Sequence, residues 1–270
     1  MDKPLLIASD VDGTLLTPLE KLSERTAAVV RRTVESGVPF VLVSGRPPRW
    51  IPPVAGKAGL TGYAVCANGA VIYDVGADRV LSVHGLEPVQ LHDLADAMSH
   101  ALPQASLATE RVVTTDEQHP PPQYVSESDF RNPWGDGDSL HASRAEVLGR
   151  TAIKMLVSDP RMTSDAMAEA AHTVLDGAFA VTFSTGAGLI EISASSITKA
   201  TGLAEVARRL DVPHERVIAF GDMPNDVQML RWAGHGVAMA NAHPAVLGAA
   251  DEVTASNAED GVAQVLERWF

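Results

Sequence analysis

The chain has 270 residues, of which 46% are hydrophobic and 20% are charged, close to the average of globular proteins. This length and composition provide for a sizeable hydrophobic core and exclude global disorder. With 34 acidic and 21 basic residues the formal net charge is −13, so the chain lacks the general basic surface that binds nucleic acid or anionic lipid.

The single cysteine favours a reducing compartment, and the hydropathy pattern argues against a membrane helix or a signal peptide. Cys66 has no second cysteine with which to form an internal disulfide. No apolar run reaches the roughly 18 residues of a membrane helix. The apolar stretch near the N-terminus meets Asp10 too soon for a signal peptide. We therefore expect a cytoplasmic protein without a membrane segment.

The N-terminal residues have the pattern of a parallel α/β sheet. The uncharged run Leu5–Ala8 predicts a buried strand, which leads into the sequence Asp10–Thr14. A helix with Ser23 as its N-cap is predicted next, and Val38–Val43 predicts a second buried strand that ends at Ser44–Arg46. Two fully apolar strands joined by a helix are typical of a parallel sheet covered on both faces.

The pattern changes after Asn68-Gly69, a dipeptide that predicts a hairpin between its two apolar flanks. Helices are predicted over residues 91–102 and 161–175. Strands are predicted over residues 105–115, 152–158, 179–185 and 188–194. We therefore expect residues 84–190 to form an inserted α+β domain, and residues 1–83 and 191–270 to form the core.

One segment of the insert, residues 116–144, is poor in apolar periodicity and rich in Pro, Asp and Ser. A loop of this length in a compact domain is usually functional or mobile. Its proline tract, His119–Pro122, has a simpler interpretation as an extended spacer.

The parallel pattern returns from Ile197 onwards. A helix over residues 199–210 leads to the apolar strand Val217–Phe220, which ends at Gly221-Asp222. Another helix over residues 226–233 follows, and then a further strand. The predicted fold class is α/β: a doubly wound, mostly parallel Rossmann-like sheet with an inserted α+β domain.

Polar side chains follow several predicted strands at the edge where such sheets bind ligands. They are Asp10, Asp12, Ser44, Gly45, Arg46, Asp222, Asn225 and Asp226, with Lys199 at the start of the helix before the late strand. Crowded carboxylates repel one another unless a cation joins them. Because all the candidate ligands are oxygen atoms, Mg²⁺ is favoured over zinc or copper. Such a Mg²⁺ usually shares a phosphate with its substrate, and Lys199, Ser44 and N–H groups around Gly45 would hold the other phosphate oxygens.

Asp10 and Asp12 are the most informative pair. On an extended segment, residues two apart point to the same face. Two carboxylates on one face can divide the work of phosphate-ester cleavage between them. One attacks phosphorus, while the other protonates the leaving oxygen and later takes a proton from water.

Four motifs in this order resemble those of the haloacid dehalogenase-like (HAD) phosphatases. The first is Asp10–Leu16, the second Ser44–Arg46, the third Lys199 and the fourth Gly221–Asp226. The closest subgroup is the Cof type, in which a large α/β cap (class IIB) is inserted between the second and third motifs. Further runs similar to this subgroup are Asn68–Ala70, Gly236–Ala242 and Asn257–Val262.

The resemblance implies a role for each acidic residue. Asp10 is expected to be the nucleophile and a metal ligand. Asp12 is expected to be the general acid/base, with its backbone carbonyl also on the metal. Asp222 is the third expected protein ligand of Mg²⁺. Asp226 is expected to lie outside the direct ligands, where it acts through water or orients Lys199.

The resemblance also implies a phosphate-binding set. Ser44 and Lys199 are expected to bind the phosphoryl group, with Asn225 nearby. For Arg46 and Asn68 two positions stay open, against the substrate or at the hinge of the cap. The family usually has Gly after the third-motif lysine, whereas this chain has Ala200.

We therefore expect a Mg²⁺-dependent phosphatase that hydrolyses phosphomonoesters of small metabolites through an aspartyl-phosphate. Its partner would be a small phosphorylated metabolite, and a monomer is expected. The substrate is left open among sugar phosphates, nucleotides, flavin mononucleotide and pyridoxal phosphate. Two alternatives stay open: a phosphotransferase or sugar phosphomutase on the same scaffold, and a phosphometabolite sensor without catalysis.

Overall fold

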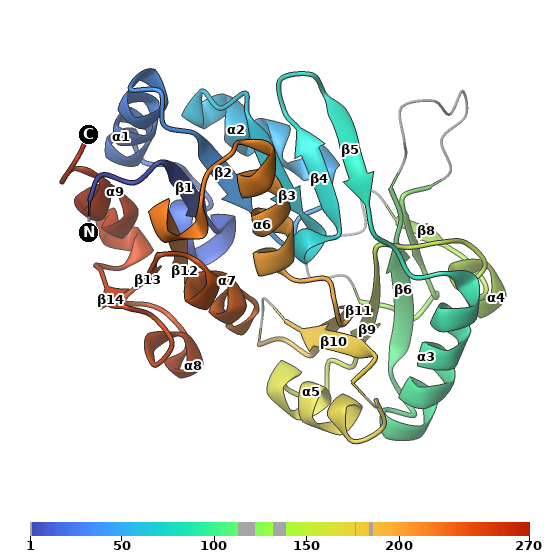
Figure 1. Cartoon of the computed structure of the whole chain (residues 1–270). Helices are drawn as coiled ribbons and strands as arrows, with labels where there is room; N and C mark the ends of the chain where they lie inside the picture. The colour runs from blue at the N-terminus through green and yellow to red at the C-terminus, as the bar shows by residue number, and fades with distance from the viewer. Residues whose placement is uncertain (1, 113–121, 132–138, 176, 184–185) are drawn as a thin grey trace. The chain divides into compact units, whose positions relative to one another are not determined.

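The computed structural model describes residues 2–112, 122–131, 139–175, 177–183 and 186–270. The chain divides into two compact units, of which unit 1 comprises Met1–Ser82 and Thr198–Phe270 and unit 2 comprises Val83–Ile197 (Figure 1). The insert expected from the sequence, residues 84–190, ends earlier than unit 2. The reason is that the last strand of the insert, β11 (Leu189–Ala194), pairs antiparallel with β9 (Lys154–Ser158) inside the sheet of unit 2.

Unit 1 contains an eight-stranded sheet. In spatial order its strands are β14 (Glu252–Val253), β13 (His235–Ala238), β12 (Val217–Gly221), β1 (Leu6–Ser9), β2 (Phe40–Val43), β3 (Tyr63–Cys66), β4 (Val71–Asp74) and β5 (Arg79–Val83). The strands from β14 to β3 run parallel, and β4 returns antiparallel to β3. This sheet confirms the expected doubly wound α/β class and contains the predicted hairpin around Asn68-Gly69.

The chain order of the strands reverses between β1 and β12. From β1 the chain continues to β2 and β3 on one side, whereas from β12 it continues to β13 and β14 on the other. Neighbouring connections that leave in opposite directions open a crevice at the carboxyl ends of the two strands. The residues that follow β1 and β12 are therefore placed together at the position where such sheets bind ligands.

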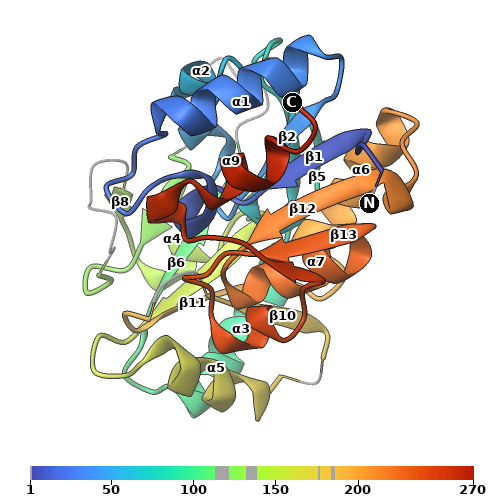
Figure 2. The same cartoon turned by 90° about the vertical axis from the view of Figure 1, so that its left-hand side faces the viewer.

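Helices cover both faces of this sheet (Figure 2). Their bounds are α1 (Glu24–Glu35), α2 (Pro52–Ala58), α6 (Lys199–Arg209), α7 (Val227–Trp232), α8 (Pro244–Leu247) and α9 (Gly261–Leu266). Figure 2 shows α1, α2 and α9 on one side and α6 and α7 on the other. The core residues Leu6 and Ala8 pack in one cluster with Leu203 and Val206 of α6, whereas Ile7 is equally buried but lies outside that cluster. Burial of both faces explains why the strands read as continuous apolar runs.

Unit 2 has an α+β fold with its own sheet and helices. Its six-stranded sheet has the order β10 (Phe179–Thr182), β11, β9, β6 (Ser106–Glu110), β7 (Tyr124–Ser126) and β8 (Ser139–His141). Its helices are α3 (Pro88–Ala101), α4 (Arg144–Val147) and α5 (Ser164–His172). Leu91 and Leu94 of α3 and Met167 of α5 share one apolar cluster with Met155 and Ile190 of the sheet.

The expected loop over residues 116–144 is only partly correct. Two short strands, β7 and β8, lie within it and pair with each other in parallel. Residues 116–121 and 132–138, which include part of the proline tract, lie outside the described residues. Among the described residues, no helix combines the length and the apolar character needed to cross a membrane.

Helix α6 approaches the Ala67–Gly69 turn at two glycines. A Cβ atom on Gly202 would lie 2.5 Å from Cγ1 of Val65 and 2.9 Å from Cα of Gly69. A Cβ atom on Gly69, whose φ is +105°, would lie 2.1 Å from the carbonyl oxygen of Thr198. The first turn of α6, which begins at Lys199, therefore takes its position from a contact that leaves no space for a side chain.

We expect Gly202→Ala to destabilise the protein by about 1–3 kcal/mol, because the added methyl group forces α6 away from the turn. The matched control is Gly56→Ala in α2, where a Cβ atom would meet nothing within 4 Å. This control should be neutral or stabilising by about 0.4–1 kcal/mol. Urea unfolding of the two variants measures both values, and equal stabilities would contradict the close packing of α6.

Candidate active site

Asp10 and Asp222 follow the two strands at which the sheet reverses its order. Asp10 comes directly after β1 and Asp222 directly after β12, and Ser9 is in register with Phe220. The backbone N–H of Asp10 donates to the carbonyl of Phe220 at 3.0 Å. Both carboxylates are buried, with 4% and 5% of the residue exposed. The parallel pairing thus brings together two acids that are far apart in sequence.

A third acid, Asp226, completes a cluster. Asp10, Asp222 and Asp226 each offer one carboxylate oxygen, and these oxygens lie within 4.8 Å of one another. Asp226 is fully buried in the short turn after β12. Three carboxylates at this spacing form a group that could hold a metal ion.

Lys199 is the cation at the centre of this cluster. Its Nζ donates to Oδ1 of Asp10 at 2.6 Å and to Oδ1 of Asp226 at 2.7 Å, and only 1% of the residue is exposed. Burial works to lower the pKa of Lys199, but the two carboxylates outweigh it and hold this pKa above its ordinary value. Lys199 is therefore charged and uses two of its three donors within the cluster.

The second oxygen of Asp226 binds the backbone. Its Oδ2 accepts from the N–H groups of Asp222 and Met223 at 3.0 and 2.9 Å. Of the two positions left open for Asp226, the structure shows direct contact with Lys199. The carboxylate therefore links the fourth-motif turn to the first residue of α6.

The turn Val11–Leu15 is in direct contact with the Asp222 carboxylate. Gly13 has a φ of +80°, and a Cβ atom there would lie 2.3 Å from Oδ2 of Asp222. Oγ1 of Thr14 donates to Oδ1 of Asp222 at 2.7 Å. The side chain of Asn241 donates to the carbonyl of Gly13 at 2.9 Å. Glycine is required here both by the backbone conformation and by the space that the carboxylate occupies.

Burial and crowding raise the pKa values of two of these acids, Asp222 and Asp10. Burial, followed by the charge of Asp226, raises the pKa of Asp222 to about 6. Burial also raises the pKa of Asp10 well above its ordinary value, because Lys199 compensates only part of the cost and Asp226 and Asp222 add repulsion. A divalent cation would relieve this repulsion.

The donor set fits a hard metal ion. The residues gathered here offer carboxylate oxygens, which are the preferred ligands of Mg²⁺ and Ca²⁺. Asp10, Asp222 and the backbone carbonyl of Asp12 are the groups that would hold the ion, since both oxygens of Asp226 already accept hydrogen bonds.

The second-motif residues lie beside the two asparagines that the sequence singled out. Ser44 follows β2 and is buried, and its Oγ accepts from the N–H of Arg46 at 3.1 Å. A Cβ atom on Gly45 would lie 3.3 Å from Oδ1 of Asn68. The same Oδ1 accepts from Nδ2 of Asn225 at 3.0 Å. These five residues of the predicted phosphate-binding set therefore lie together. Oδ1 of Asn225 is buried without a donor among the described residues.

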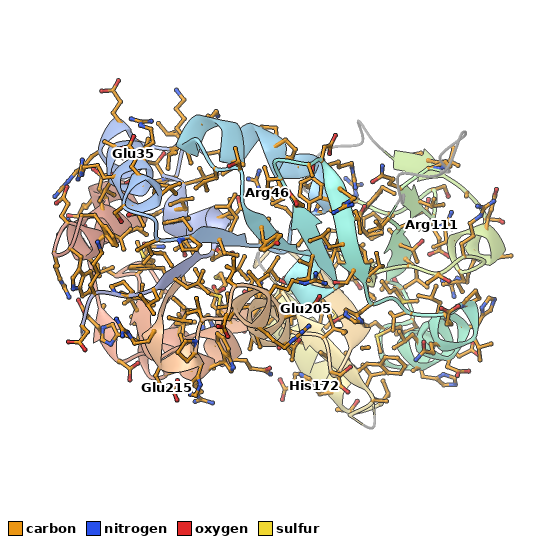
Figure 3. The ribbon with its side chains drawn as sticks, turned by 45° about the horizontal axis from the view of Figure 1, so that its top comes forward. Glu35, Arg46, Arg111, His172, Glu205 and Glu215 are labelled. Atoms are coloured by element: carbon orange, nitrogen blue, oxygen red, sulfur yellow. The ribbon has the colours of Figure 1, made fainter. Side chains whose placement is uncertain are left out.

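Asp12 lies outside the cluster of Asp10, Asp222 and Asp226, and its side chain pairs with Arg46. Arg46, which is labelled in Figure 3, donates from Nε to Oδ2 of Asp12 at 2.8 Å and from Nη2 to Oδ1 at 2.5 Å. This pair raises the pKa of Arg46 through the hydrogen bond to Asp12. The side chain of Asp12 is 47% exposed, in contrast to the buried Asp10. The sequence left Arg46 between the substrate and the hinge, and the structure places it on Asp12.

Sequence reasoning missed three contacts of this site. They are the bond from Thr14 to Asp222, the bond from Asn241 to Gly13 and the pairing of Arg46 with Asp12. A signal was available for Asn241, which lies in the run Gly236–Ala242 that is similar to the Cof-type subgroup.

Comparisons with known proteins agree with this geometry. The family model for haloacid dehalogenase-like hydrolases matches residues 7–266. The 5-amino-6-(5-phospho-D-ribitylamino)uracil phosphatase YitU of Bacillus subtilis (strain 168) is 31% identical over 281 residues, which cover 99% of this chain and 98% of YitU. The pyridoxal phosphate phosphatase YbhA of Escherichia coli (strain K12) is 27% identical over 272 residues and 97% of each chain.

A solved haloacid dehalogenase-like hydrolase from Bacteroides thetaiotaomicron is also similar, with 27% identity and a TM-score of 0.78 over 99% of this chain and 100% of its own. The family match includes both units and all four motifs. The expected family is therefore confirmed. The chain belongs to the haloacid dehalogenase-like hydrolases, as a phosphoric monoester hydrolase of the Cof type.

Proposed function

We propose that this protein is a Mg²⁺-dependent phosphatase that hydrolyses phosphomonoesters of small metabolites through an aspartyl-phosphate on Asp10. The main support is the state of the Asp10 carboxylate. Its Oδ1 accepts from Lys199, whereas its Oδ2 accepts no hydrogen bond from any residue within the described ranges. A buried carboxylate that is fixed at one oxygen and open at the other is suited to nucleophilic attack.

The first half of the reaction transfers the phosphoryl group to the protein. Oδ2 of Asp10 forms a bond to phosphorus while the bond from phosphorus to the leaving oxygen breaks. The carboxyl group of Asp12 gives its proton to that oxygen, and the product alcohol leaves. A bound Mg²⁺ supplies neutralisation of the phosphoryl charge.

The second half of the proposed reaction hydrolyses the aspartyl-phosphate and regenerates the free Asp10 carboxylate. The Asp12 carboxylate takes a proton from water as the water oxygen attacks phosphorus, and the bond from phosphorus to Asp10 breaks. The net reaction consumes one phosphomonoester and one water and yields one alcohol and one phosphate. Lys199 holds Asp10 in line, and Asp226 keeps Lys199 in place.

The relatives support a small phosphorylated metabolite as the substrate. The names of YitU and YbhA specify phosphatases of a phosphoribitylamino-uracil and of pyridoxal phosphate. Phosphatase names favour hydrolysis over the phosphotransferase and sensor alternatives. Unit 2 would act as the cap that selects the non-phosphate part of the substrate, in a cytoplasmic and monomeric enzyme.

The nucleophile is tested by Asp10→Asn. We expect phosphate release in the presence of Mg²⁺, measured over a panel of sugar phosphates, nucleotides and cofactor phosphates, to fall by about 10³-fold or more, because an amide is a poor nucleophile. Glu35→Gln on the exposed end of α1 is the control and should keep full activity. Substantial turnover by Asp10→Asn would refute the assignment.

The metal site is tested by Asp222→Asn and thermal unfolding. Mg²⁺ should raise the Tm of the unaltered protein, since it binds only the folded state, and this increase should be largely lost in the variant. Without metal, the variant should be at least as stable as the unaltered protein because one buried, repelling carboxylate is gone. An unchanged response to Mg²⁺ would argue against Asp222 as a ligand.

The same variant tests the pH dependence of the metal-free protein. The folded-state pKa of Asp222, about 6, lies above its ordinary value of 3.8, so the folded protein binds this proton more tightly. This group therefore makes the metal-free protein more stable as the pH falls from 7 through 6 towards 4. Thermal unfolding in EDTA should show this gain in the unaltered protein and a smaller gain in Asp222→Asn. Equal pH profiles would contradict the raised pKa.

A further inference from the structure

The pair formed by Arg46 and Asp12 has a geometry that the proposed reaction does not by itself explain. Two guanidinium nitrogens of Arg46 donate to the two carboxylate oxygens of Asp12, at 2.8 and 2.5 Å. Bidentate pairs of this kind fix direction as well as distance, because the guanidinium plane must align with the carboxylate. Arg46 therefore determines which way the Asp12 carboxylate faces.

No other hydrogen bond to the Asp12 side chain occurs among the described residues. The residue belongs to the turn Val11–Leu15, where its own φ and ψ are −84° and 122° and Gly13 follows at a positive φ. With its side chain 47% exposed, Asp12 is not fixed by packing either. Without Arg46 the carboxylate would rotate among its staggered positions.

Arg46 is in turn held firmly at its backbone. Its N–H donates to Oγ of Ser44 at 3.1 Å, and its carbonyl accepts from the N–H of Ala67 at 2.9 Å. Pro47 follows, which restricts the backbone of Arg46 to extended conformations. Its side chain is only 21% exposed. The second motif thus presents the guanidinium from a fixed base at the end of β2.

We propose that Arg46 is a positioning residue for Asp12: it aims the carboxyl group for both proton transfers and does not itself bind the phosphoryl group. This proposal rests on the proposed function, in which Asp12 gives a proton to the leaving oxygen and later takes one from water. When Asp12 carries its proton, the remaining carbonyl oxygen still accepts from Arg46 while the hydroxyl faces the leaving oxygen.

The occupied donors of Arg46 support this role over direct phosphate binding. The two nitrogens that would form a fork on a phosphate both donate to Asp12. Lys199, in contrast, already lies within the cluster around Asp10.

Leaving-group dependence separates the two roles. Arg46→Met should lower kcat/KM by about 10–100-fold for an alkyl phosphate, whose leaving oxygen needs a proton. For nitrophenyl phosphate, whose leaving group departs without one, kcat/KM should change by less than about 3-fold. Competitive inhibition by inorganic phosphate should also change by less than about 3-fold. Equal losses with both substrates would overturn the proposal, and so would weaker inhibition by phosphate.

Three further variants complete the test. Asp12→Asn should show the same dependence on the leaving group, and the double variant should lose little more than either single one, because the residues act as a unit. Additive losses would contradict the proposal. Arg46→Lys keeps the positive charge but has a single donor nitrogen in place of the fork, and it should recover part of the alkyl phosphate activity. It also replaces Arg46→Met if that variant does not fold, with the same comparison of the two substrates deciding the outcome.

Arg25→Met is the matched control. Arg25 forms the same kind of pair, from Nε and Nη2 to the two carboxylate oxygens of Glu267, between α1 and the end of α9. The Arg25→Met variant should leave both activities unchanged.

If the unaltered protein releases no phosphate, or if Asp10→Asn stays active, the proposed function itself fails. If turnover depends on Asp10 but Arg46→Met affects both substrates equally, only the role of Arg46 fails.

Discussion

The buried contact of Lys199 with two carboxylates is the interaction on which the rest of the site depends. One ammonium group with 1% of the residue exposed lies 2.6 Å from Asp10 and 2.7 Å from Asp226. Burial of charges is costly unless they are paired and hydrogen-bonded, so removing either kind of partner leaves an uncompensated charge. The cluster still contains more negative than positive charge, because Asp222 lies in the same group. A divalent cation would relieve this imbalance, as the proposed function requires.

The backbone around the cluster is built to allow this crowding. Gly13, Gly69, Gly202 and Gly221 lie where a Cβ atom would come within about 3 Å of a neighbouring group. For Gly221 that group is the Cβ of Asp226, at 2.5 Å. The strand ends supply the acids, and the glycines let the turns approach closely enough for the acids to share one cation. Asn241 adds a hydrogen bond to the turn that contains Asp12 and Gly13.

The sequence was sufficient for the fold class and for the residues that follow β1, β2 and β12. Parallel strands buried on both faces appear as uninterrupted apolar runs, and the polar residue after each run is placed by the sheet itself. Contacts between side chains of separate turns could not be predicted in this way. Arg46 reaches Asp12 and Thr14 reaches Asp222 through rotamers and turn geometry that no periodicity encodes. Strands β7 and β8 carry no such signal, because each has three residues in a polar segment. Part of β11 lies beyond the predicted boundary at residue 190, because only strand pairing shows that β11 belongs to the sheet of unit 2.

The most direct test of the account is to find where the phosphoryl group resides during turnover. The unaltered protein would be mixed with Mg²⁺ and an excess of a good substrate, quenched in acid within the first turnovers, digested and analysed by mass spectrometry. We predict a peptide that spans β1 and the following turn and carries the mass of one phosphoryl group on Asp10, lost on treatment with hydroxylamine as expected of an acyl phosphate. A phosphoryl group on any other residue, under conditions of rapid turnover, would contradict the assignment of Asp10 as the nucleophile.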